Sequence, residues 1–305
     1  MDLKITGVIR PNPKNWWMSN YVGASCVLGI DEESTKSYDI SVLAGGRGVD
    51  GISRLGIIKL TLDKFDYNLL NYEEVGQPII KLGERGAFDE TGMSYPWYFN
   101  NGVSEFIFYT GWKLNQNTGF ENNLGLLEKV KGKWVRYSRA PILPLTNDEP
   151  FGTGSVAVYQ IKDKFHLLYT SFLSWNSSNS DGHEYGIKHA TSTDLVNWKR
   201  KLDFLIPPTN SLHAICRPSI LGNNILFSAR GVKYNLMTLP LLGSNIPPNS
   251  LSTKNAQKVK IDNQGESGFD KSVEYSYPFN LNGQKLCLFN GDDYGESGLG
   301  IGVIS

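Results

Sequence analysis

Carboxylates and guanidiniums occur in this chain in sequence-distant groups that could act together on one ligand. Acids stand in short stretches with turn residues, as in Gly86-Ala87-Phe88-Asp89 and Asp148-Glu149-Pro150. Paired carboxyl groups can do general acid and base work when their surroundings separate their pKa values. An arginine fork pairs bidentately with carboxylate or phosphate, so several arginines at one site would favour an anionic ligand.

Two sets of side chains are the candidates for this chemistry. The candidate catalytic carboxylates are Asp89, Glu149, Asp270 and Glu274. The candidate substrate-binding residues lie near predicted strand ends and are Trp17, Arg47, Arg54, Trp112, Trp175, Glu184, His213, Arg217, Arg230 and Asp292. Each set also has a structural interpretation, since acids cap turns, arginines form internal ion pairs and tryptophans pack in cores.

Extended apolar runs recur with a period of about 60 residues and predict the elements that position these side chains. The predicted inner strands open at Gly23, Ser94, Ser155, Arg217 and Tyr277. The predicted second strands are Tyr38–Ala44, Glu105–Thr110, Lys164–Thr170, Asn224–Ala229 and Gln284–Asn290. The predicted third strands are Arg54–Leu60, Leu124–Lys129, Tyr185–Thr191, Tyr234–Leu239 and Leu299–Ile304. The predicted fourth strands are Leu70–Val75, Lys133–Tyr137, Asn197–Lys201 and Ala256–Ile261.

The fifth repeat has no fourth strand of its own, whereas Leu3–Ile9 is a spare strand near the start of the sequence. Pairing the two would close a ring and remove two exposed sheet edges. We therefore predict an all-β, five-bladed β-propeller with four-stranded blades, a single domain over residues 1–305 closed by the N-terminal strand. The irregular segments Trp175–His183 and Pro240–Asn255 are predicted to be loops. A β-sandwich with coincidental strand spacing is the alternative.

Propeller geometry predicts which residues share a face. The start of each first strand, the end of each second and the start of each third lie on one face of the ring. The candidate acids, arginines and tryptophans fall at those positions, whereas the opposite strand ends carry hairpin turns such as Asn100-Asn101-Gly102 and Asn282-Gly283. This asymmetry predicts a binding site at the central funnel of that face.

Composition and charge argue against some classes of binding partner. The formal net charge is zero, with 30 basic and 30 acidic residues, which argues against nucleic-acid binding. No apolar stretch approaches the ~20 residues that span a bilayer, and Met1-Asp2-Leu3-Lys4 lacks a signal-peptide core, so we expect a cytoplasmic protein. Cys26, Cys216 and Cys287 are expected to be small buried hydrophobes. Aromatic residues make up 12% of the chain, and their rings suit the flat faces of sugars.

One turn carries a family resemblance. Ser192-Thr193-Asp194-Leu195-Val196-Asn197-Trp198 resembles the S-x-D-L-x-x-W turn of five-bladed propeller glycosidases, the arabinanase, β-xylosidase, invertase and levansucrase-like enzymes. Gly86-x-Phe88-Asp89 with Tyr109-Thr110-Gly111-Trp112, and Phe289-Asn290-Gly291 with Gly298-Leu299-Gly300, resemble a subgroup that accompanies bacterial surface-polysaccharide synthesis genes. The resemblance covers essentially the whole chain and is specific for the fold rather than the activity.

The resemblance implies carboxylates that cleave or form a glycosidic bond at the funnel. Asp89 would match the family's second-blade aspartate and Glu149 its proton donor. The family's base aspartate opens the first blade, where this chain has Ser19-Asn20-Tyr21-Val22-Gly23 and no acid. Asp270 or Glu274 would have to substitute for it, or hydrolysis by the standard scheme is lost.

Two hypotheses follow. The first is a carbohydrate-active enzyme, glycoside hydrolase-like or a glycosyltransferase of polysaccharide biosynthesis, with an acidic or nucleotide-linked sugar bound in the funnel. The alternative is a non-catalytic propeller that binds a glycan or sugar metabolite. No cofactor or metal is predicted: some relatives hold a structural calcium, but no acidic loop here has a recognisable calcium spacing. The expected partner is a carbohydrate or nucleotide sugar, with no nucleic acid and no membrane span. The sequence does not specify an oligomeric state.

Overall fold

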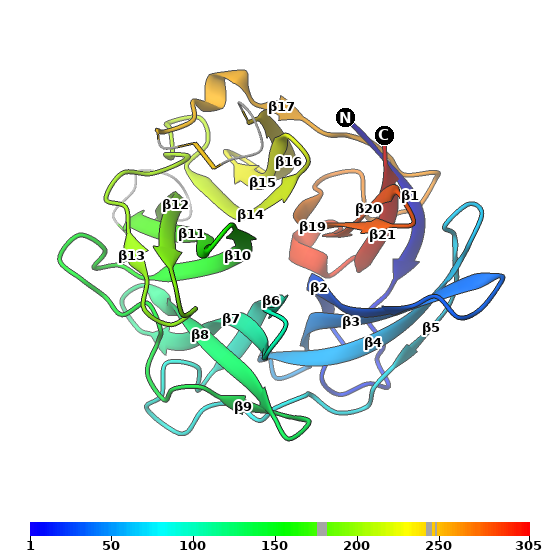
Figure 1. Ribbon diagram of the computed structural model, residues 1–305, viewed down its shortest axis with the longest axis horizontal. Coiled ribbons are helices and arrows are strands. Elements are labelled where there is room, and N and C mark those ends of the chain that lie inside the picture. The colour runs from blue at the N-terminus through cyan, green and yellow to red at the C-terminus, as the bar shows by residue number, and fades with distance from the viewer. Residues whose placement is uncertain (176–181, 242–245, 248) are drawn as a thin grey trace. The chain divides into compact units, whose positions relative to one another are not determined.

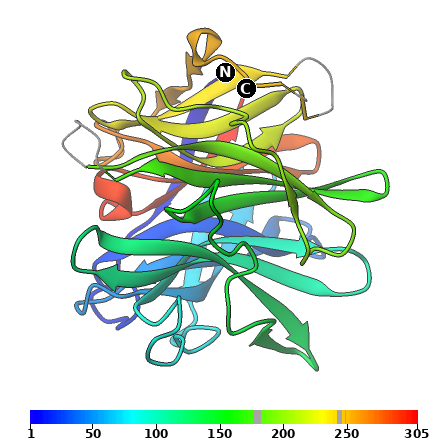
Figure 2. The same ribbon diagram turned by 90° about the vertical axis from the view of Figure 1, so that its left-hand side faces the viewer.

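The computed structural model describes residues 1–175, 182–241, 246–247 and 249–305. The predicted loops Trp175–His183 and Pro240–Asn255 therefore lie partly outside the described residues. The prediction of an all-β chain is confirmed: helical structure in the described ranges is limited to two short 3-10 turns, η1 (Thr253–Asn255) and η2 (Asp293–Gly295) (Figures 1 and 2). Among those residues no helix has the length and apolar character needed to cross a bilayer.

The chain packs into two units. Unit 1 combines Met1–Lys81 with Val259–Ser305, and unit 2 is Leu82–Lys258. Most strands of each unit form antiparallel meanders, in which successive strands pair; β1 instead pairs with β21, and β18 pairs with β1 in parallel.

Unit 1 holds two meanders. The first consists of β2 (Tyr21–Asp31), β3 (Ser37–Arg47), β4 (Ser53–Asp63) and β5 (Leu69–Glu74). The second consists of β19 (Glu274–Leu281), β20 (Gln284–Asn290) and β21 (Leu299–Ile304), followed by β1 (Asp2–Ile9) and the short edge strand β18 (Lys260–Asp262). Figure 1 shows β1 beside β21, so the first strand of the chain completes the sheet formed by the last three.

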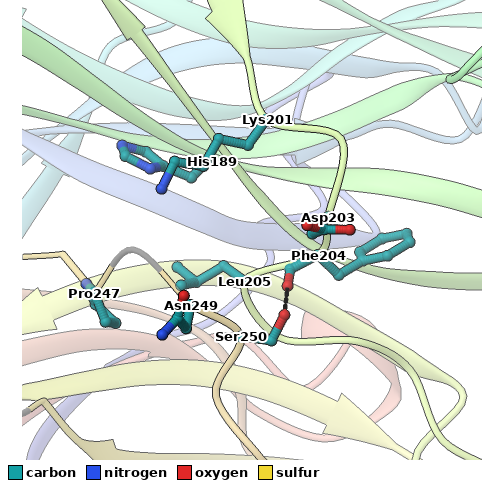
Figure 3. Close-up of a pocket in the computed structure, with 8 residues that line it drawn as sticks. All are labelled: His189, Lys201, Asp203, Phe204, Leu205, Pro247, Asn249 and Ser250. Carbon is teal, nitrogen blue, oxygen red and sulfur yellow. Dashed lines mark hydrogen bonds between the residues drawn. The ribbon is translucent and has the colours of Figure 1, made fainter.

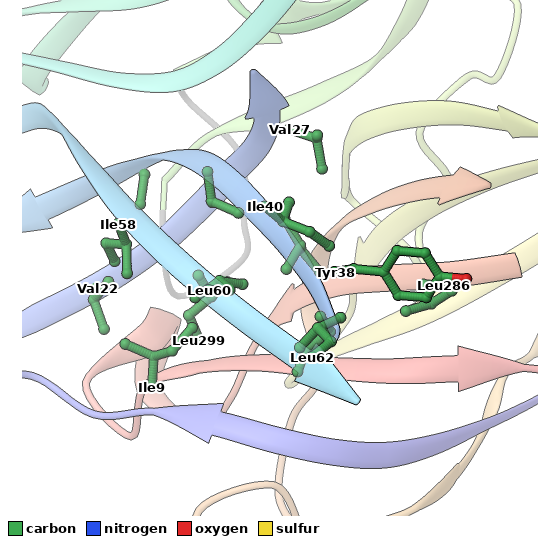
Figure 4. Close-up of a cluster of buried hydrophobic side chains, with 14 of the residues drawn as sticks. Ile9, Val22, Val27, Tyr38, Ile40, Ile58, Leu60, Leu62, Leu286 and Leu299 are labelled. Carbon is green, nitrogen blue, oxygen red and sulfur yellow. The ribbon is translucent and has the colours of Figure 1, made fainter. Parts of the chain in front are cut away.

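The core of unit 1 lies between these meanders. Figure 4 shows apolar side chains of β2, β3 and β4 facing those of β1 and β21, among them Val22, Ile40, Ile58, Ile9 and Leu299. All five are at most 1% exposed. Burying one such side chain contributes roughly 1.5–3 kcal/mol, so alternation along the strands holds the meanders together.

Unit 2 holds three meanders. The first is β6 (Gly92–Asn100), β7 (Glu105–Asn115), β8 (Gly119–Val130) and β9 (Lys133–Arg136). The second is β10 (Thr153–Ile161), β11 (Lys164–Ser174), β12 (Glu184–Ser192) and β13 (Lys199–Arg200). The third is β14 (Ala214–Leu221), β15 (Asn224–Arg230), β16 (Tyr234–Pro240) and β17 (Gln257–Lys258). Figure 2 shows their long hairpins in teal, green and yellow.

The first strand of every meander contains a β-bulge at the same point of the register. The residue just before the bulge faces the second strand, as Gly23 faces Gly45 and Ser94 faces Thr110. Four bulges then place a residue other than glycine at positive φ: Ala24 at 42°, Tyr95 at 51°, Arg217 at 50° and Tyr275 at 56°. Such a conformation costs about 1–3 kcal/mol per residue and re-aims the side chain.

The turn that carries the family resemblance is a closed hydrogen-bond network. The Ser192 hydroxyl accepts from the amides of Asp194 and Leu195, and the Asp194 carboxylate accepts from the amides of Val196 and Asn197. Burial alone would raise the pKa of Asp194, but the bonds from Asn197, Val196 and Ser192 outweigh it and lower that pKa. The Trp198 ring packs edge-on against Phe108, so this turn fastens the second meander of unit 2 to the first.

The cysteine prediction is confirmed. Cys26 lies in β2, Cys216 in β14 and Cys287 in β20, and all three are buried. Their place in the sheets is that of small apolar side chains.

Candidate functional site

Unit 2 carries a continuous run of aromatic rings, called here the aromatic band. Its members are Tyr95, Trp112, Phe120, Phe172, Trp175 and His183. Neighbouring ring centroids lie between 4.9 Å, for Trp112 and Phe120, and 6.4 Å, for Tyr95 and Trp112. Phe172 is buried and the other five are half-buried, so the band presents ring surface that a ligand could cover.

The band ends at a polar cluster. The guanidinium of Arg230 donates to Nε2 of His183 over 3.1 Å, which places the proton of the neutral imidazole on Nδ1. Arg230 also lies over the ring of Tyr234 at 4.8 Å and is 5% exposed. The hydroxyls of Tyr185 and Tyr234 are hydrogen-bonded, and burial, followed by the nearby Cys216 and Tyr185, raises the pKa of Tyr234. A positive charge is thus held rigidly beside the rings.

The meander geometry explains why these side chains meet. Thr110 and Ser228 face the residues just before the bulges in β6 and β14. Trp112 and Arg230 follow two residues later, so each points to the same side of its sheet as that residue. The bulge of β6 turns Tyr95 onto Trp112. Flat rings beside a guanidinium and an imidazole offer stacking surface together with a directional donor for an anion.

Three predicted binding residues belong to this region: Trp112 and Trp175 are in the band and Arg230 is at its end. The Glu184 carboxylate accepts from the Ser174 hydroxyl at 3.3 Å beside His183. His213 is buried, and its carbonyl accepts from the amide of Tyr185. The structure therefore brings together part of the predicted set from β7, β11, β12 and β15.

Arg217 lies deeper than a surface ligand group. It is fully buried, its guanidinium donates to the carbonyl of Pro96 at 3.0 Å, and it lies over the ring of Trp97 at 5.7 Å. Its own amide donates to the Ser155 hydroxyl at 2.9 Å. Since these partners come from β6 and β10, Arg217 ties the three first strands of unit 2 together.

The predicted residues of unit 1 have mainly structural contacts. Trp17 requires a correction, because its ring is 0% exposed and its indole N–H donates to the carbonyl of Val75. Gly46 and Gly56 provide its space, since a Cβ on either would come within 2.5 Å of the ring. A tryptophan enclosed in this way packs in the core and offers no stacking surface to a ligand.

The two predicted arginines of unit 1 are already engaged. Arg47 lies over the ring of Tyr21 at 4.9 Å and donates to the Ser53 hydroxyl. Arg54 forms an ion pair with Asp50 at 2.6 Å. The Arg54 side chain is 13% exposed and also lies over the ring of Trp16 at 4.9 Å, so both arginines are held by neighbours within unit 1.

The three predicted acids of unit 1 differ in burial. Asp270 is exposed and accepts from the amide side chain of Asn263. Glu274 is 1% exposed at the start of β19 and faces Asn290 in the register. Asp292 accepts from the backbone amides of Lys271 and Ser272, the contacts of a turn-capping aspartate.

Asp89 forms what we call the Asp89 clamp. Its Oδ2 accepts from the hydroxyl of Tyr109 at 2.9 Å and from Nε of Arg136 at 2.8 Å. Tyr109 comes from β7 and Arg136 from β9, so the carboxylate fastens the outermost strand of its meander to an inner one. Burial, followed by the charge of Asp89, raises the pKa of Tyr109, which therefore keeps its proton and donates it.

Glu149 forms the corresponding Glu149 clamp one meander later. Its carboxylate accepts from Tyr169 and Ser171 of β11 and pairs with Arg200 of β13 at 2.7 Å and with Lys188 of β12 at 3.5 Å. Burial alone would raise the pKa of Glu149, but the bonds from Ser171 and Arg200 and the charge of Lys188 outweigh it and lower that pKa. A proton donor needs the opposite shift.

The clamp partners were missed in the sequence, although part of the signal was there. Tyr109 and Tyr169 each follow their acid by 20 residues and each opens a Tyr-Thr pair. That repeat marks the two acids as equivalent members of successive repeats. The arginines carry no comparable signal, because Arg136 and Arg200 lie 47 and 51 residues from their acids.

Two pockets lie in unit 2 outside the band. The larger, of about 570 Å³, is lined by residues 82–87 with Asp89, Arg136 and Arg139. The smaller, of about 220 Å³, is shown in Figure 3, where His189 and Lys201 face Asp203, Asn249 and Ser250. Burial, followed by the nearby His166 and Lys201, lowers the pKa of His189 to about 4, so its ring is neutral at pH 7. Within the described residues no group of three or more His, Cys, Asp or Glu side chains is placed to hold a metal ion.

No family model matches the chain. Two uncharacterised proteins of Mycobacterium tuberculosis, from strains CDC 1551 and H37Rv, are each 28% identical to it over 235 residues, which cover 75% of this chain and 76% of the relative. Neither relative has a described activity.

Solved structures resemble the chain over almost its whole length. A glycosyl hydrolase from Bacteroides ovatus has a TM-score of 0.63 at 15% identity, with 99% of this chain and 94% of that one covered. A GH130 structure, from a family of mannoside phosphorylases that contains glycoside hydrolases, has 0.61 at 14% identity, with coverage of 99% and 94%. The GH32 β-fructofuranosidase of Bombyx mori has 0.59 at 14% identity, with coverage of 96% and 62%. These likenesses show a propeller fold.

Proposed function

We propose that the protein binds a carbohydrate carrying an anionic group, with sugar rings stacked on the aromatic band and the anion at Arg230. The observation that carries this proposal is the unbroken run of half-buried rings that ends at a guanidinium. Sugar faces match the rings, and a buried arginine pairs strongly with a carboxylate or phosphate. The ligand class is therefore an acidic glycan or a nucleotide-linked sugar.

The fold supports the same proposal. We propose that the five meanders form one five-bladed propeller over residues 1–305, since every first strand has its bulge at the same register position. The pairing of β1 with β21 gives the last meander its fourth strand.

A binding role fits the acids better than hydrolysis does. In the enzymatic version of the proposal, Asp89 and Glu149 act as base and acid and Asp270 or Glu274 supplies the third carboxylate. Glu149, however, is held ionised by Lys188 and Arg200, and a general acid needs a raised pKa. We therefore place non-catalytic glycan or sugar-metabolite binding first and glycosyl transfer or hydrolysis second. A cytoplasmic role in polysaccharide assembly stays a prediction.

Calorimetric titration of the full chain tests the binding proposal. The panel contains glucuronate-bearing oligosaccharides, UDP-glucuronate and neutral oligosaccharides of equal length. We expect Trp175→Ala to weaken binding of the acidic ligands at least about tenfold. The matched control is Phe65→Ala, which removes an exposed aromatic ring of unit 1 and should leave binding unchanged. Equal affinity of wild type and Trp175→Ala for every ligand would remove the aromatic band as the site.

Turnover separates the two versions. The same ligands are incubated with wild type, Asp89→Asn and Glu149→Gln, and released sugar is quantified by chromatography. Binding without turnover in the wild type supports the non-catalytic version. Turnover that disappears in both variants, while their folding is intact, would restore the acids to catalysis.

A further inference from the structure

The larger pocket of unit 2 lies on the side of β7 away from the aromatic band. Side chains alternate along a strand, and Tyr109 and Lys113 point to the side of Asp89, where Lys113 donates to the carbonyl of Gly86. Trp112, between them in register, points to the other side and into the band. The pocket is therefore a separate cavity behind the proposed glycan site.

The lining of this pocket is rich in arginine. Three guanidiniums, of Arg85, Arg136 and Arg139, face two carboxylates, of Glu84 and Asp89, which leaves an excess of one positive charge. Arg139 is paired with Glu84 at 2.5 Å, but both side chains are more than three-quarters exposed, so solvent screens that pair. A ligand anion can displace Glu84 at little cost.

One buried carboxylate oxygen of Asp89 indicates what a ligand of this pocket would need besides an anionic group. Oδ2 of Asp89 carries both clamp bonds, whereas Oδ1 is buried and has no hydrogen-bond partner among the described residues. A Cβ on Gly83 would come within 2.0 Å of Oδ1, so only glycine leaves room there. A buried acceptor without a donor costs about 1–3 kcal/mol, and a ligand hydroxyl would recover that cost.

The Glu149 clamp shows that the fold does not require this open oxygen. Oε1 of Glu149 accepts from Tyr169 and Ser171, and Oε2 accepts from Arg200. The same scaffold can therefore satisfy both oxygens of its acid. Of the two clamps, only the Asp89 clamp has an acid oxygen without a hydrogen-bond partner among the described residues, and only that clamp borders the arginine-lined pocket.

We propose that this pocket binds a small hydroxylated oxyanion, a sugar acid or sugar phosphate. Its anionic group pairs with Arg85 and Arg139, and one of its hydroxyls donates to Oδ1 of Asp89. The site is independent of the glycan site on the aromatic band. A sugar acid and a sugar phosphate both present an oxyanion with a neighbouring hydroxyl. Separate titrations with each distinguish the two ligand classes.

Titration of the full chain with glucuronate, glucose 1-phosphate, glucose and sulfate tests the proposal. We expect glucuronate or glucose 1-phosphate to bind at least about tenfold more tightly than glucose and than sulfate. The double variant R85A/R139A should lose at least about tenfold of that affinity. Lys133→Ala removes an exposed cation of β9 that does not line the pocket, and it should leave these affinities unchanged.

The same titration is repeated with the Asp89→Asn variant, whose folding is verified by circular dichroism. The variant should bind sulfate more tightly, because a negative charge is gone, and lose the preference for hydroxylated anions. Sulfate binding equal to that of glucuronate and of glucose 1-phosphate in the wild type would overturn the proposal, as would unchanged affinity in R85A/R139A. If Asp89→Asn does not fold, R85A/R139A decides alone. Loss of affinity in Trp175→Ala would instead assign the ligand to the aromatic band.

Discussion

The Asp89 clamp and the Glu149 clamp both pair an acid with a tyrosine and an arginine, but they differ in how many oxygens of the acid are hydrogen-bonded. In each, an acid before a first strand accepts from a tyrosine 20 residues later and pairs with an arginine of the fourth strand. The Glu149 clamp adds Ser171 and Lys188 and uses both oxygens. The Asp89 clamp has Gly111 where the other has Ser171, and it borders a pocket. The comparison shows that the same anchoring device can satisfy both oxygens of its acid, as at Glu149, or only one of them, as at Asp89.

Removing the charge of Glu149 should have the largest effect on stability. In Glu149→Gln, the buried Lys188 and the partly buried Arg200 lose their anion, and an uncompensated buried charge costs about 3–5 kcal/mol. Urea denaturation would measure the free energy of unfolding, with the exposed Glu73→Gln as control. A loss below about 1 kcal/mol would show that this clamp is not an anchor.

The cost of Glu149→Gln should also depend on pH. The folded-state pKa of Glu149 is lowered, so its contribution is fully present above the unfolded value near 4.5 and is lost as pH falls through the folded value. Variant and wild type should therefore converge in stability at acid pH. Parallel curves of melting temperature against pH would contradict this reading.

His189, near the Glu149 clamp, should be a second cause of lower folding stability at acid pH. It neighbours Lys188 on β12, and its pKa falls from 6.5 in the unfolded chain to about 4 in the folded one. The unfolded state then binds the extra proton, so stability declines by about 3 kcal/mol as pH falls from 6.5 to 4. His189→Asn should flatten this decline and His213→Asn should preserve it. An equal slope in wild type and His189→Asn would exclude the effect.

Asp89→Asn should destabilise the protein less than Glu149→Gln does. The released cation is Arg136 alone, whose side chain is 21% exposed and can reach water. We expect a loss of about 2 kcal/mol in the free energy of unfolding, measured in the same urea series. A larger loss than for Glu149→Gln would reverse the ranking of the two clamps.

Ser171→Ala should have the smallest effect. It removes one hydrogen bond to a carboxylate and makes the Glu149 clamp resemble the Asp89 clamp, at a cost of about 1–2 kcal/mol. The matched variant is Ser138→Ala, whose hydroxyl accepts only from the nearby amide of Ala140. Equal losses in the two variants would mean that the extra bond of the Glu149 clamp has no special worth.

The recurrence of extended apolar runs located the strands well, because many strands carry unbroken stretches of buried residues. The predicted strand Leu3–Ile9 corresponds to β1 at Asp2–Ile9, and Lys133–Tyr137 to β9 at Lys133–Arg136. Four of the five second strands extend further than predicted, as β7 continues to Asn115. The polar end of β7 lacks the apolar run from which the boundary was taken.

The candidate site could be predicted only in part, because the sequence did not show which residues are the hydrogen-bond and ion-pair partners of its side chains. Position on one face predicted that Trp112, Trp175 and Arg230 lie together, and the structure places them along one run of ring contacts that ends at Arg230. Whether an acid meets a ligand or an arginine depends on the fourth strand, which lies 47 or more residues away from its acid. Trp17 was misplaced for a related reason: nothing local signals that Gly46 and Gly56 leave a cavity for its ring.

The pairing of β1 with β21 has a consequence for biosynthesis. Asp2 and Ser305 exchange reciprocal backbone bonds of 3.1 and 3.0 Å, and Leu3 faces Ile304. The β1 segment cannot pair with β21 until β21 has been synthesised. Contacts of such sequence separation form slowly, so this pairing should be a late step in folding.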